Sequence, residues 1–307
     1  AGERPREPTP GGSLIRRVRE IAYLRAGHTI TSSRRRLART LARPGREDAA
    51  WQGRRRGAGK YTGMTTWLTD VLAARARGEV PALPEAPLTG SGRALALAPH
   101  PDDPDAVGVT LRLLAAGGWT LYWTVLSSSW LGVLDDFVGP DRAAKDAARE
   151  AEQRASARFF GLPDAHLAFL RLTTGDDGWI ADAPANAARV CAALHATRPD
   201  IVLLPYGEDS NPDHRLVARW FAAWARDAGY PLAALANEDP KSRDFRPHVL
   251  VTFGEETAAW KAHLLEHHRS QSARNMAQRG ITFAARILDT NREADGYAER
   301  FQVMTWG

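Results

Sequence analysis

Apolar segments alternate with amphipathic segments along the chain from residue 93 onward. Short runs rich in Ala, Leu, Ile and Val are followed by stretches in which apolar residues recur every three or four positions. The first pattern predicts buried strands, and the second predicts helices packed on a sheet. We expect strands at 94–98, 119–126, 167–172, 200–205 and 248–253, and helices at 105–116, 141–160, 184–197, 214–227 and 256–278.

Repeated alternation of strand and helix is the pattern of an α/β fold. It predicts a Rossmann-like, doubly wound, mostly parallel sheet with helices on both faces. In such a sheet, ligands bind beyond the carboxyl ends of the strands. The loops that follow the predicted strands are therefore where we expect the chemistry of this protein.

The first 90 residues have a different texture. Residues 14–42 carry apolar positions near helical spacing with arginines between them, and residues 67–76 predict another short helix. Residues 81–92 are rich in Pro, Gly and Ser, which predicts a linker. We therefore predict a basic, partly helical N-terminal extension and linker at 1–90 and a main domain at 91–307.

The net charge of +5 is unevenly distributed along the chain. Residues 1–60 contain 16 Lys and Arg against 5 Asp and Glu, a balance of +11, so the remaining residues carry −6. The arginine clusters at 34–36 and 54–56 are of a kind that binds phosphates or an anionic membrane surface. No nucleic-acid-binding motif accompanies them. We expect a solvated arm, or a helix packed on the main domain or on a second subunit of a homo-oligomer, rather than a nucleic-acid partner.

Cysteine content and hydropathy limit the classes of protein that fit. The single cysteine, Cys191, excludes a disulfide within the chain and a thiolate zinc site. No window approaches the roughly 18 apolar residues that span a bilayer, and the N-terminus lacks the apolar region of a secretory signal. We expect a soluble, cytoplasmic protein. Because residue 1 is Ala rather than Met, the sequence leaves open whether a leader was removed before it.

Two groups of metal-binding residue types follow predicted strands. His100, Asp102 and Asp103 come directly after the first strand, and residues 206–214, Tyr-Gly-Glu-Asp-Ser-Asn-Pro-Asp-His, come after the fourth. Histidine and carboxylate side chains suit zinc and other divalent metals, and three protein ligands with one open position form a catalytic site. Loops at the carboxyl ends of neighbouring strands can converge on one ion.

The two groups predict distinct roles for their members. His100, Asp103 and His214 are the expected ligands, which leaves Asp102 to act as a general base toward water that attacks an amide carbonyl. Each residue alone is more often part of a turn with a side-chain cap than a metal ligand. The prediction therefore rests on the occurrence of both groups after two strands.

Both motifs resemble those of a known family. Residues 98–103, Ala-Pro-His-Pro-Asp-Asp, and 211–214, Asn-Pro-Asp-His, resemble the two signatures of the LmbE-like de-N-acetylases. That family includes N-acetylglucosaminyl-phosphatidylinositol de-N-acetylase (PIG-L) and the deacetylases of mycothiol and bacillithiol synthesis. The resemblance extends over 93–307. Further matches follow in chain order at 149–152, 159–161, 268–271 and 298–301.

The resemblance implies a zinc-dependent hydrolase. Its substrate would be a small-molecule or glycoconjugate N-acetylated amino sugar, from which the acetyl group is removed. By residue, the resemblance implies zinc, or another divalent metal, on His100, Asp103 and His214, with Asp102 as general base, Asp213 in an orienting role and Arg149 near the substrate.

Three positions depart from the family pattern. Pro104 stands where the family has a glutamate, and 109–110 is Val-Thr where the family has a glycine pair. Asn211 replaces a histidine that can stabilise the tetrahedral oxyanion. An asparagine amide can donate a hydrogen bond to an oxyanion, although it brings no positive charge. We therefore expect a weaker or differently tuned deacetylase.

The substrate walls and two alternative functions stay open at this point. Trp130 follows a predicted strand and can offer its indole face to a sugar, as can Trp179. One alternative is hydrolysis of a larger amide, such as a thiol conjugate or a natural-product intermediate. The other is a catalytically weakened binding protein of the same fold, recruited to an anionic partner by residues 1–60.

Overall fold

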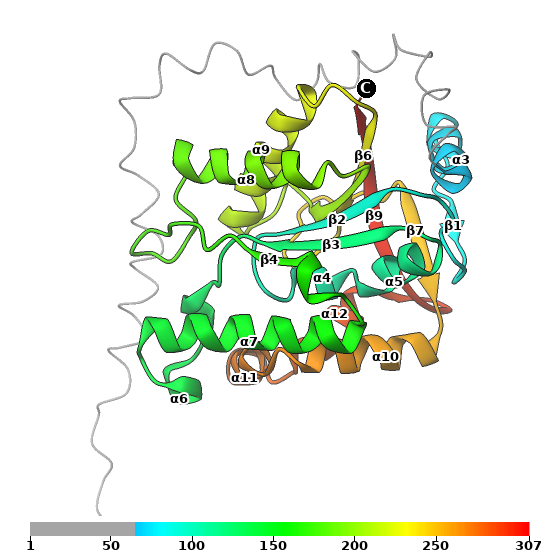
Figure 1. Cartoon of the computed structure of the whole chain (residues 1–307). Helices are drawn as coiled ribbons and strands as arrows, with labels where there is room; N and C mark the ends of the chain where they lie inside the picture. The colour runs from blue at the N-terminus through cyan, green and yellow to red at the C-terminus, as the bar shows by residue number, and fades with distance from the viewer. Residues whose placement is uncertain (1–64, 307) are drawn as a thin grey trace, which may run out of the picture. The chain divides into compact units, whose positions relative to one another are not determined.

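The computed structural model describes residues 65–306. The helices predicted within 14–42 and both arginine clusters lie outside the described residues. Within 65–306, nine strands form one sheet in the order β1-β7-β9-β6-β5-β2-β3-β4, and β8 pairs with β9 (Figure 1). The strands are β1 (Ala82–Leu83), β2 (Arg93–Ala98), β3 (Thr120–Val125), β4 (Leu167–Phe169), β5 (Ile201–Pro205), β6 (Leu232–Asn237), β7 (Val249–Phe253), β8 (Arg292–Glu293) and β9 (Gly296–Trp306).

Helices cover both faces of this sheet, so the predicted α/β class is confirmed (Figure 1). Two short 3-10 turns, η3 (Trp130–Gly132) and η4 (Asp164–His166), lie in the loops. The helices are α3 (Thr66–Ala76), α4 (Asp103–Ala106), α5 (Gly108–Ala116), α6 (Asp135–Val138), α7 (Arg142–Phe160), α8 (Pro184–Thr197), α9 (Pro212–Arg226), α10 (Glu255–Glu266), α11 (Arg269–Arg279) and α12 (Phe283–Thr290).

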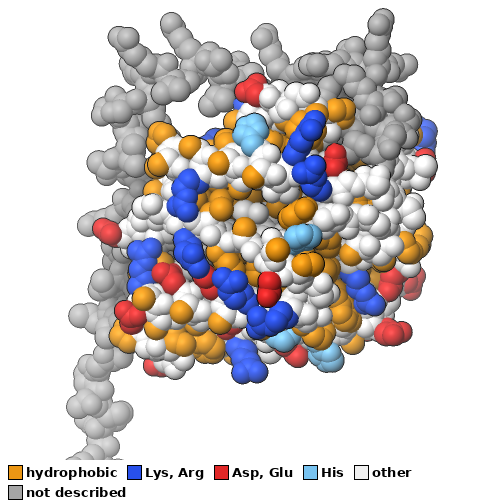
Figure 2. Space-filling view, in the orientation of Figure 1, with side chains coloured by type: hydrophobic (Ala, Val, Ile, Leu, Met, Phe, Trp, Pro, Cys, Tyr) orange, Lys and Arg blue, Asp and Glu red, His pale blue; other side chains and the backbone are white. Residues whose placement is uncertain are grey.

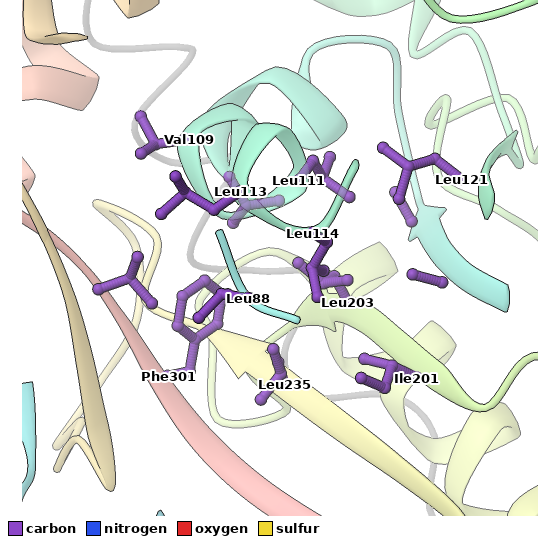
Figure 3. Packing of buried hydrophobic residues seen from close by; sticks show 14 of the residues in the cluster. Leu88, Val109, Leu111, Leu113, Leu114, Leu121, Ile201, Leu203, Leu235 and Phe301 are labelled. Carbon is purple, nitrogen blue, oxygen red and sulfur yellow. The ribbon is translucent and has the colours of Figure 1, made fainter. Parts of the chain in front are cut away.

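The central strand β2 divides its side chains between two cores because successive residues of a strand point to opposite faces. Leu95 and Leu97 join the core under α8 and α9. Ala94, Ala96 and Ala98 join the core under α5 and α10. Figure 3 shows this second core, in which leucines of α5 pack over β5 and β6. The small alanines let these helices approach the sheet closely.

The order of the strands creates a switch point beside β2. After β2 the chain adds β3 and then β4 in parallel on one side, and β5 and β6 follow in parallel on the other side. Loops that leave β2 and β5 therefore diverge to opposite sides, which opens a crevice at their carboxyl ends. The loops 99–103 and 206–211 line this crevice, and both carry predicted site residues.

Several element boundaries differ from the sequence prediction. The single helix expected at 256–278 is two helices, α10 and α11, and the helix expected at 105–116 breaks at Val107 into α4 and α5. The strand expected at 167–172 is limited to β4. The prediction lacked β1, β6, β8, α6 and α12, and of β9 it noted only the segment 298–301.

The elements before residue 90 take part in the same fold. β1 pairs in parallel with β7, and Trp67, Leu68 and Val71 of α3 are buried in the core under α5. The division of the chain at residue 90 stays a prediction. Part of the segment predicted as extension and linker nevertheless contributes to the sheet and core of the main domain.

A buried ion pair fixes the start of α5, where the sequence departs from the family's glycine pair. The carboxylate of Glu299 on β9 accepts hydrogen bonds from the backbone N–H groups of Val109 (3.0 Å) and Thr110 (2.8 Å). Lys261 Nζ donates to the same carboxylate at 2.6 Å and to Asn291 Oδ1 at 2.7 Å. A carboxylate at a helix N-terminus satisfies free N–H groups and complements the helix dipole.

Candidate metal centre

Three predicted ligands converge in the crevice between β2 and β5. His100 and Asp103 follow β2, and His214 lies in the first turn of α9 after β5. One ligand atom from each residue lies within 4.8 Å of the others. The structure therefore brings together the residues that the two motifs predicted as one site.

A carboxylate fixes the ring of His100. Its Nε2 lies 2.8 Å from Asp213 Oδ2, and Asp213 Oδ1 accepts a hydrogen bond from the backbone N–H of Ile180. The Nδ1 of His100 is turned toward Asp103 Oδ2, at 3.6 Å. A hydrogen bond from one ring nitrogen to a carboxylate sets the tautomer and orients the other nitrogen toward a metal. Asp213 is placed to orient His100 in this way.

His214 is held by the same arrangement from the opposite side. Its Nδ1 lies 2.9 Å from Asp209 Oδ2, and both side chains are completely buried. Its Nε2 is buried, has no hydrogen-bond partner among the described residues, and lies 3.6 Å from Asp103 Oδ1. A buried polar atom without a partner is costly in a folded protein. The unpartnered nitrogen, with one oxygen of Asp103 turned toward each imidazole, fits a divalent metal with nitrogen and oxygen ligands.

The electrostatics of Asp103 and His214 fit residues that bind a metal. Burial raises the pKa of Asp103, although the two histidines oppose the shift. Burial disfavours protonation of His214, but the carboxylates of Asp103 and Asp209 outweigh it and raise the pKa of His214. Protons are therefore retained where a metal would displace them.

Asp102, the expected general base, has an unusual backbone. Its φ of +97° lies in the left-handed region, which costs energy for a residue other than glycine. Its backbone N–H donates to Gln153 Oε1 at 2.9 Å, and its Oδ1 accepts from Arg149 Nη2 at 3.2 Å. These contacts from α7 hold Asp102 in the strained conformation, with its side chain still 14% exposed at the crevice.

The two predicted substrate residues differ in their surroundings. Arg149 is buried, and it donates to the backbone carbonyls of Pro101 and Ser128 as well as to Asp102. Trp130 is half-buried in η3, with the Arg142 guanidinium 5.3 Å from its ring centre. Contact of either residue with substrate stays a prediction. The observed contacts of Arg149 instead fix the loop that carries Asp102.

A buried network lies behind Asp102, next to the Pro104 departure. Asp105 Oδ2 is 2.7 Å from His268 Nε2 and accepts from Gln153 Nε2 at 2.9 Å. Asp105 and His268 are fully buried. The carboxylate missing at position 104 is thus present one residue later, and Gln153 connects it to the backbone of Asp102. His268 was marked in the sequence only as part of a motif, and Asp105 and Gln153 were not predicted as site residues.

Asn211 forms the N-cap of α9. Its Oδ1 accepts a hydrogen bond from the backbone N–H of Asp213 at 2.9 Å, and its own N–H donates to Asp209 Oδ1 at 2.6 Å. Asparagine is among the preferred residues at this position of a helix. The capping bond does not use the Nδ2 amide, so the predicted donation to an oxyanion is compatible with it and stays a prediction.

Two further charged residues near the centre come from the loop after β6, which the sequence did not mark. Asp239 lies close enough to Asp209 and His214 for one atom of each to fall within 4.8 Å. Lys241 Nζ is 3.6 Å from Asp239 Oδ1. The signal available was their place after a strand, but β6 itself was not predicted.

Comparison with known protein families gives one match for these motifs. Residues 95–225 match the family model of PIG-L, the GlcNAc-PI de-N-acetylases. This segment is similar to the PIG-L family. The matched segment contains both motifs, and the resemblance seen in the sequence is thereby confirmed. PIG-L, or LmbE-like, proteins are a family of metal-dependent deacetylases. Among functionally curated proteins, no sequence matches this chain.

Solved structures share the fold of this chain. N,N'-diacetylchitobiose deacetylase from Pyrococcus horikoshii has a TM-score of 0.56 and 18% identity, over 69% of this chain and 83% of that one. A conserved protein from Thermus thermophilus has a TM-score of 0.50 and 24% identity, over 68% and 92%. A zinc-inhibited form of teicoplanin deacetylase has a TM-score of 0.50 and 16% identity, over 70% and 98%.

In the part of the chain that the structure describes, no helix combines the length and the apolar character required to cross a bilayer.

Proposed function

We propose that this chain is a zinc-dependent N-deacetylase that removes the acetyl group from an N-acetylated amino sugar or a glycoconjugate of one. The observation that carries the proposal is the unpartnered Nε2 of His214, which faces Asp103 and His100 in the crevice beside Asp102. Two nitrogens and one carboxylate oxygen form the donor set expected for zinc, and another divalent metal is possible.

The residues around the centre have separate roles in the proposed reaction. A divalent metal held by His100, Asp103 and His214 would polarise the amide carbonyl and make water more acidic. Asp102 accepts the proton of the attacking water and delivers a proton to the leaving amine. Arg149 keeps the Asp102 carboxylate in place through its hydrogen bond at 3.2 Å. The Nδ2 amide of Asn211 donates to the oxyanion as it forms.

A cavity lies next to the loop after β3, whose Ser127 N–H donates to the carbonyl of Pro99 before the first motif, and it suits the sugar part of such a substrate. It measures about 330 Å³ and is lined by hydroxyl and charged groups, including Ser127, Ser128, Arg142, Asp146 and Thr174. Figure 2 shows Lys and Arg side chains interleaved with Asp and Glu on this face of the molecule. Paired charges and hydroxyl groups can exchange hydrogen bonds with sugar hydroxyls. The cavity also leaves room for a larger amide, which is the alternative substrate class.

Metal analysis and acetate release together test the proposal. The full chain is titrated with zinc to one equivalent, and acetate release is measured on N-acetylglucosamine and N,N'-diacetylchitobiose. We expect one bound metal per chain, acetate release that stops on chelation, and recovery when zinc is restored. Release of a different acid from a larger amide would favour the alternative. A chain that binds one zinc but hydrolyses no N-acyl substrate would overturn the proposal and favour a binding protein.

A further inference from the structure

The loop after β6 lies along the second motif. Strands β5 and β6 pair in parallel as far as their last residues, so the chain leaves both strands at the same edge of the sheet. Beyond that edge, the backbone N–H of Ser210 donates to the carbonyl of Lys241 at 3.1 Å, and Asp209 forms a bridge with Ser242. The backbone of Lys241 is therefore fixed beside the residue that precedes Asn211.

A tight turn sets the conformation of this loop. Residues 239–242 are Asp-Pro-Lys-Ser, and the N–H of Ser242 donates to the carbonyl of Asp239 at 2.8 Å, which closes a β-turn. Aspartate at the first position and proline at the second favour such a turn. The carboxylate of Asp239 also accepts a hydrogen bond from the N–H of Lys241 at 2.9 Å. The local sequence thus holds Lys241 against Asp239.

Asp239 connects Lys241 with the metal centre. One carboxylate oxygen each of Asp239 and Asp209 and one ring nitrogen of His214 all lie within 4.8 Å of one another. Lys241 Nζ lies 3.6 Å from Asp239 Oδ1. The ammonium group therefore lies next to a carboxylate that is itself beside a predicted metal ligand.

The donors of the Lys241 ammonium group are not used within the protein. At 3.6 Å the contact with Asp239 is an ion pair that is too long for a hydrogen bond. Among residues 65–306, no acceptor lies within hydrogen-bonding distance of Lys241 Nζ. The guanidinium of Arg149, in contrast, donates to two backbone carbonyls and to Asp102. The three N–H donors of Lys241, whose side chain is 35% exposed, are available to a ligand.

The surrounding carboxylates keep Lys241 charged. Burial opposes its charge, but the carboxylates of Asp239 and Asp103 outweigh burial and raise the pKa of Lys241. The group is therefore a permanent cation at neutral pH. A cation with unused donors at the edge of a crevice can bind an anionic atom of a substrate.

Amide hydrolysis adds negative charge to a crevice that is already rich in carboxylates. When water attacks, an electron pair of the C=O double bond moves to the oxygen, which becomes an oxyanion. The Asn211 amide, which we propose as its donor, is neutral. Nearby carboxylates repel a further negative charge. Those in or beside the centre, besides the general base, are the carboxylates of Asp103, Asp209, Asp213 and Asp239.

We propose that Lys241 is a further catalytic residue, whose ammonium group stabilises the oxyanion together with the Asn211 amide. The inference rests on the proposed function and deepens it. As the water oxygen bonds to the carbonyl carbon, Asp102 takes the proton of the water, and Lys241 donates a charged hydrogen bond to the oxyanion. When the C–N bond breaks, its electron pair goes to the nitrogen, which receives the proton from Asp102. Lys241 keeps its protons throughout.

Variants that remove or keep the charge test this role in the zinc-loaded full chain, with N-acetylglucosamine and N,N'-diacetylchitobiose as substrates. Lys241→Met should lower kcat by about 10²- to 10³-fold, the loss typical of one oxyanion donor, with little change in KM. Lys241→Arg keeps the charge and should have a kcat about tenfold above that of Lys241→Met. Unchanged kcat in Lys241→Met, or equal losses in the two variants, would overturn the inference.

A control variant and the metal affinity distinguish catalysis from a structural role. Arg226→Met removes an exposed cation at the last residue of α9, about 20 Å along the helix from its first turn, and should leave kcat unchanged. Lys241→Met should bind zinc at least as tightly as the unmodified chain, because the cation that it removes repels the metal. Zinc binding that weakens in step with kcat would mean that Lys241 only shapes the ligand loops, and would contradict the inference.

Anion binding separates this inference from the proposed function. Methylphosphonate has the tetrahedral shape and negative charge of the oxyanion state, and calorimetry measures its affinity for the zinc-loaded chain without turnover. We expect Lys241→Met to weaken this affinity by about tenfold and Arg226→Met to leave it unchanged. If no acetate is released from either sugar, the proposed function fails, but this difference would still uphold Lys241 as the oxyanion contact. Absent binding, or equal affinity in the unmodified chain and Lys241→Met, would reject the inference.

Discussion

His214 Nδ1 lies 2.9 Å from Asp209 Oδ2, and no part of either side chain reaches solvent. This pair leaves the second nitrogen of the imidazole as a ready metal ligand, aimed at Asp103. His100 and Asp213 repeat the relationship at 2.8 Å on the other side of the centre. Each histidine therefore has its own carboxylate. Asp213 belongs to the second motif, and Asp209 lies two residues before it.

Asp209→Asn should weaken metal binding without unfolding the chain. An amide can still accept the backbone hydrogen bond from Asn211, but it no longer stabilises the ring of His214 by its charge. Loss of such a partner typically lowers metal affinity by about 10- to 100-fold. Competition with a chelating dye measures the affinity. Asp227→Asn at the end of α9 is the control, and equal zinc affinity in both variants would contradict the orienting role of Asp209.

Asp102→Asn and Asp103→Asn should separate catalysis from metal binding. Asp102→Asn should retain one equivalent of zinc and lose about 10²- to 10⁴-fold in kcat, since a general base is removed. Asp103→Asn should lose zinc, because its carboxylate faces both histidines. Metal content by elemental analysis and kcat on one substrate test the two assignments. If Asp102→Asn were the variant that lost zinc, the two assignments would have to be exchanged.

Zinc affinity should fall steeply in mild acid. The carboxylates of Asp103 and Asp209 raise the pKa of His214 above its ordinary 6.5 despite burial, and burial raises the pKa of Asp103. Zinc must displace these protons. Zinc affinity is therefore greatest above the raised pKa of His214, and it declines as the pH falls through that pKa. We expect about a tenfold loss per pH unit or more over that range. Titrations between about pH 8 and 5 measure it, and a flat profile would exclude proton displacement.

The sequence predicted the elements and site residues whose signals are local. Helix α8 begins and ends where its periodicity predicted, and the two motifs placed His100 and His214 at the ends of correct strands. Strand β6, Leu-Ala-Ala-Leu-Ala-Asn, lacks β-branched and aromatic residues, so its pattern did not distinguish it from a helix. The break between α10 and α11 falls at His267 and His268, without Gly or Pro to mark it.

The unpredicted parts of the site depend on contacts between distant segments. Asp105 and His268 are 163 positions apart and meet only because α10 packs beside α4, and α11 beside α7. Asp239 and Lys241 follow the strand that was missed, so nothing in the local pattern connected them with His214. The contact between Asp102 and Arg149 likewise depends on the packing of helix α7 against the first motif.

Asn211→Ser should distinguish helix capping from catalysis. Serine can accept the hydrogen bond from the Asp213 N–H and so keep α9 capped, but it has no amide to donate to an oxyanion. We expect an unfolding midpoint close to that of the unmodified chain and a kcat lowered by about 10²- to 10³-fold. Asn211→Ala should lose about 1 kcal/mol of stability as well. Unchanged kcat in the serine variant would remove Asn211 from the catalytic step.

Glu299→Gln should be among the most destabilising single changes, although Glu299 lies outside the metal centre. It leaves the buried ammonium of Lys261 without its carboxylate, and the start of α5 loses a charged partner. Burial already lowers the pKa of Lys261, so the uncompensated charge is costly. We expect the free energy of unfolding to fall by about 3–5 kcal/mol, measured by urea denaturation. Adding Lys261→Met to Glu299→Gln should recover part of this loss, because it removes the stranded charge. Two single losses that simply add in the double variant would show that the residues do not act as a pair.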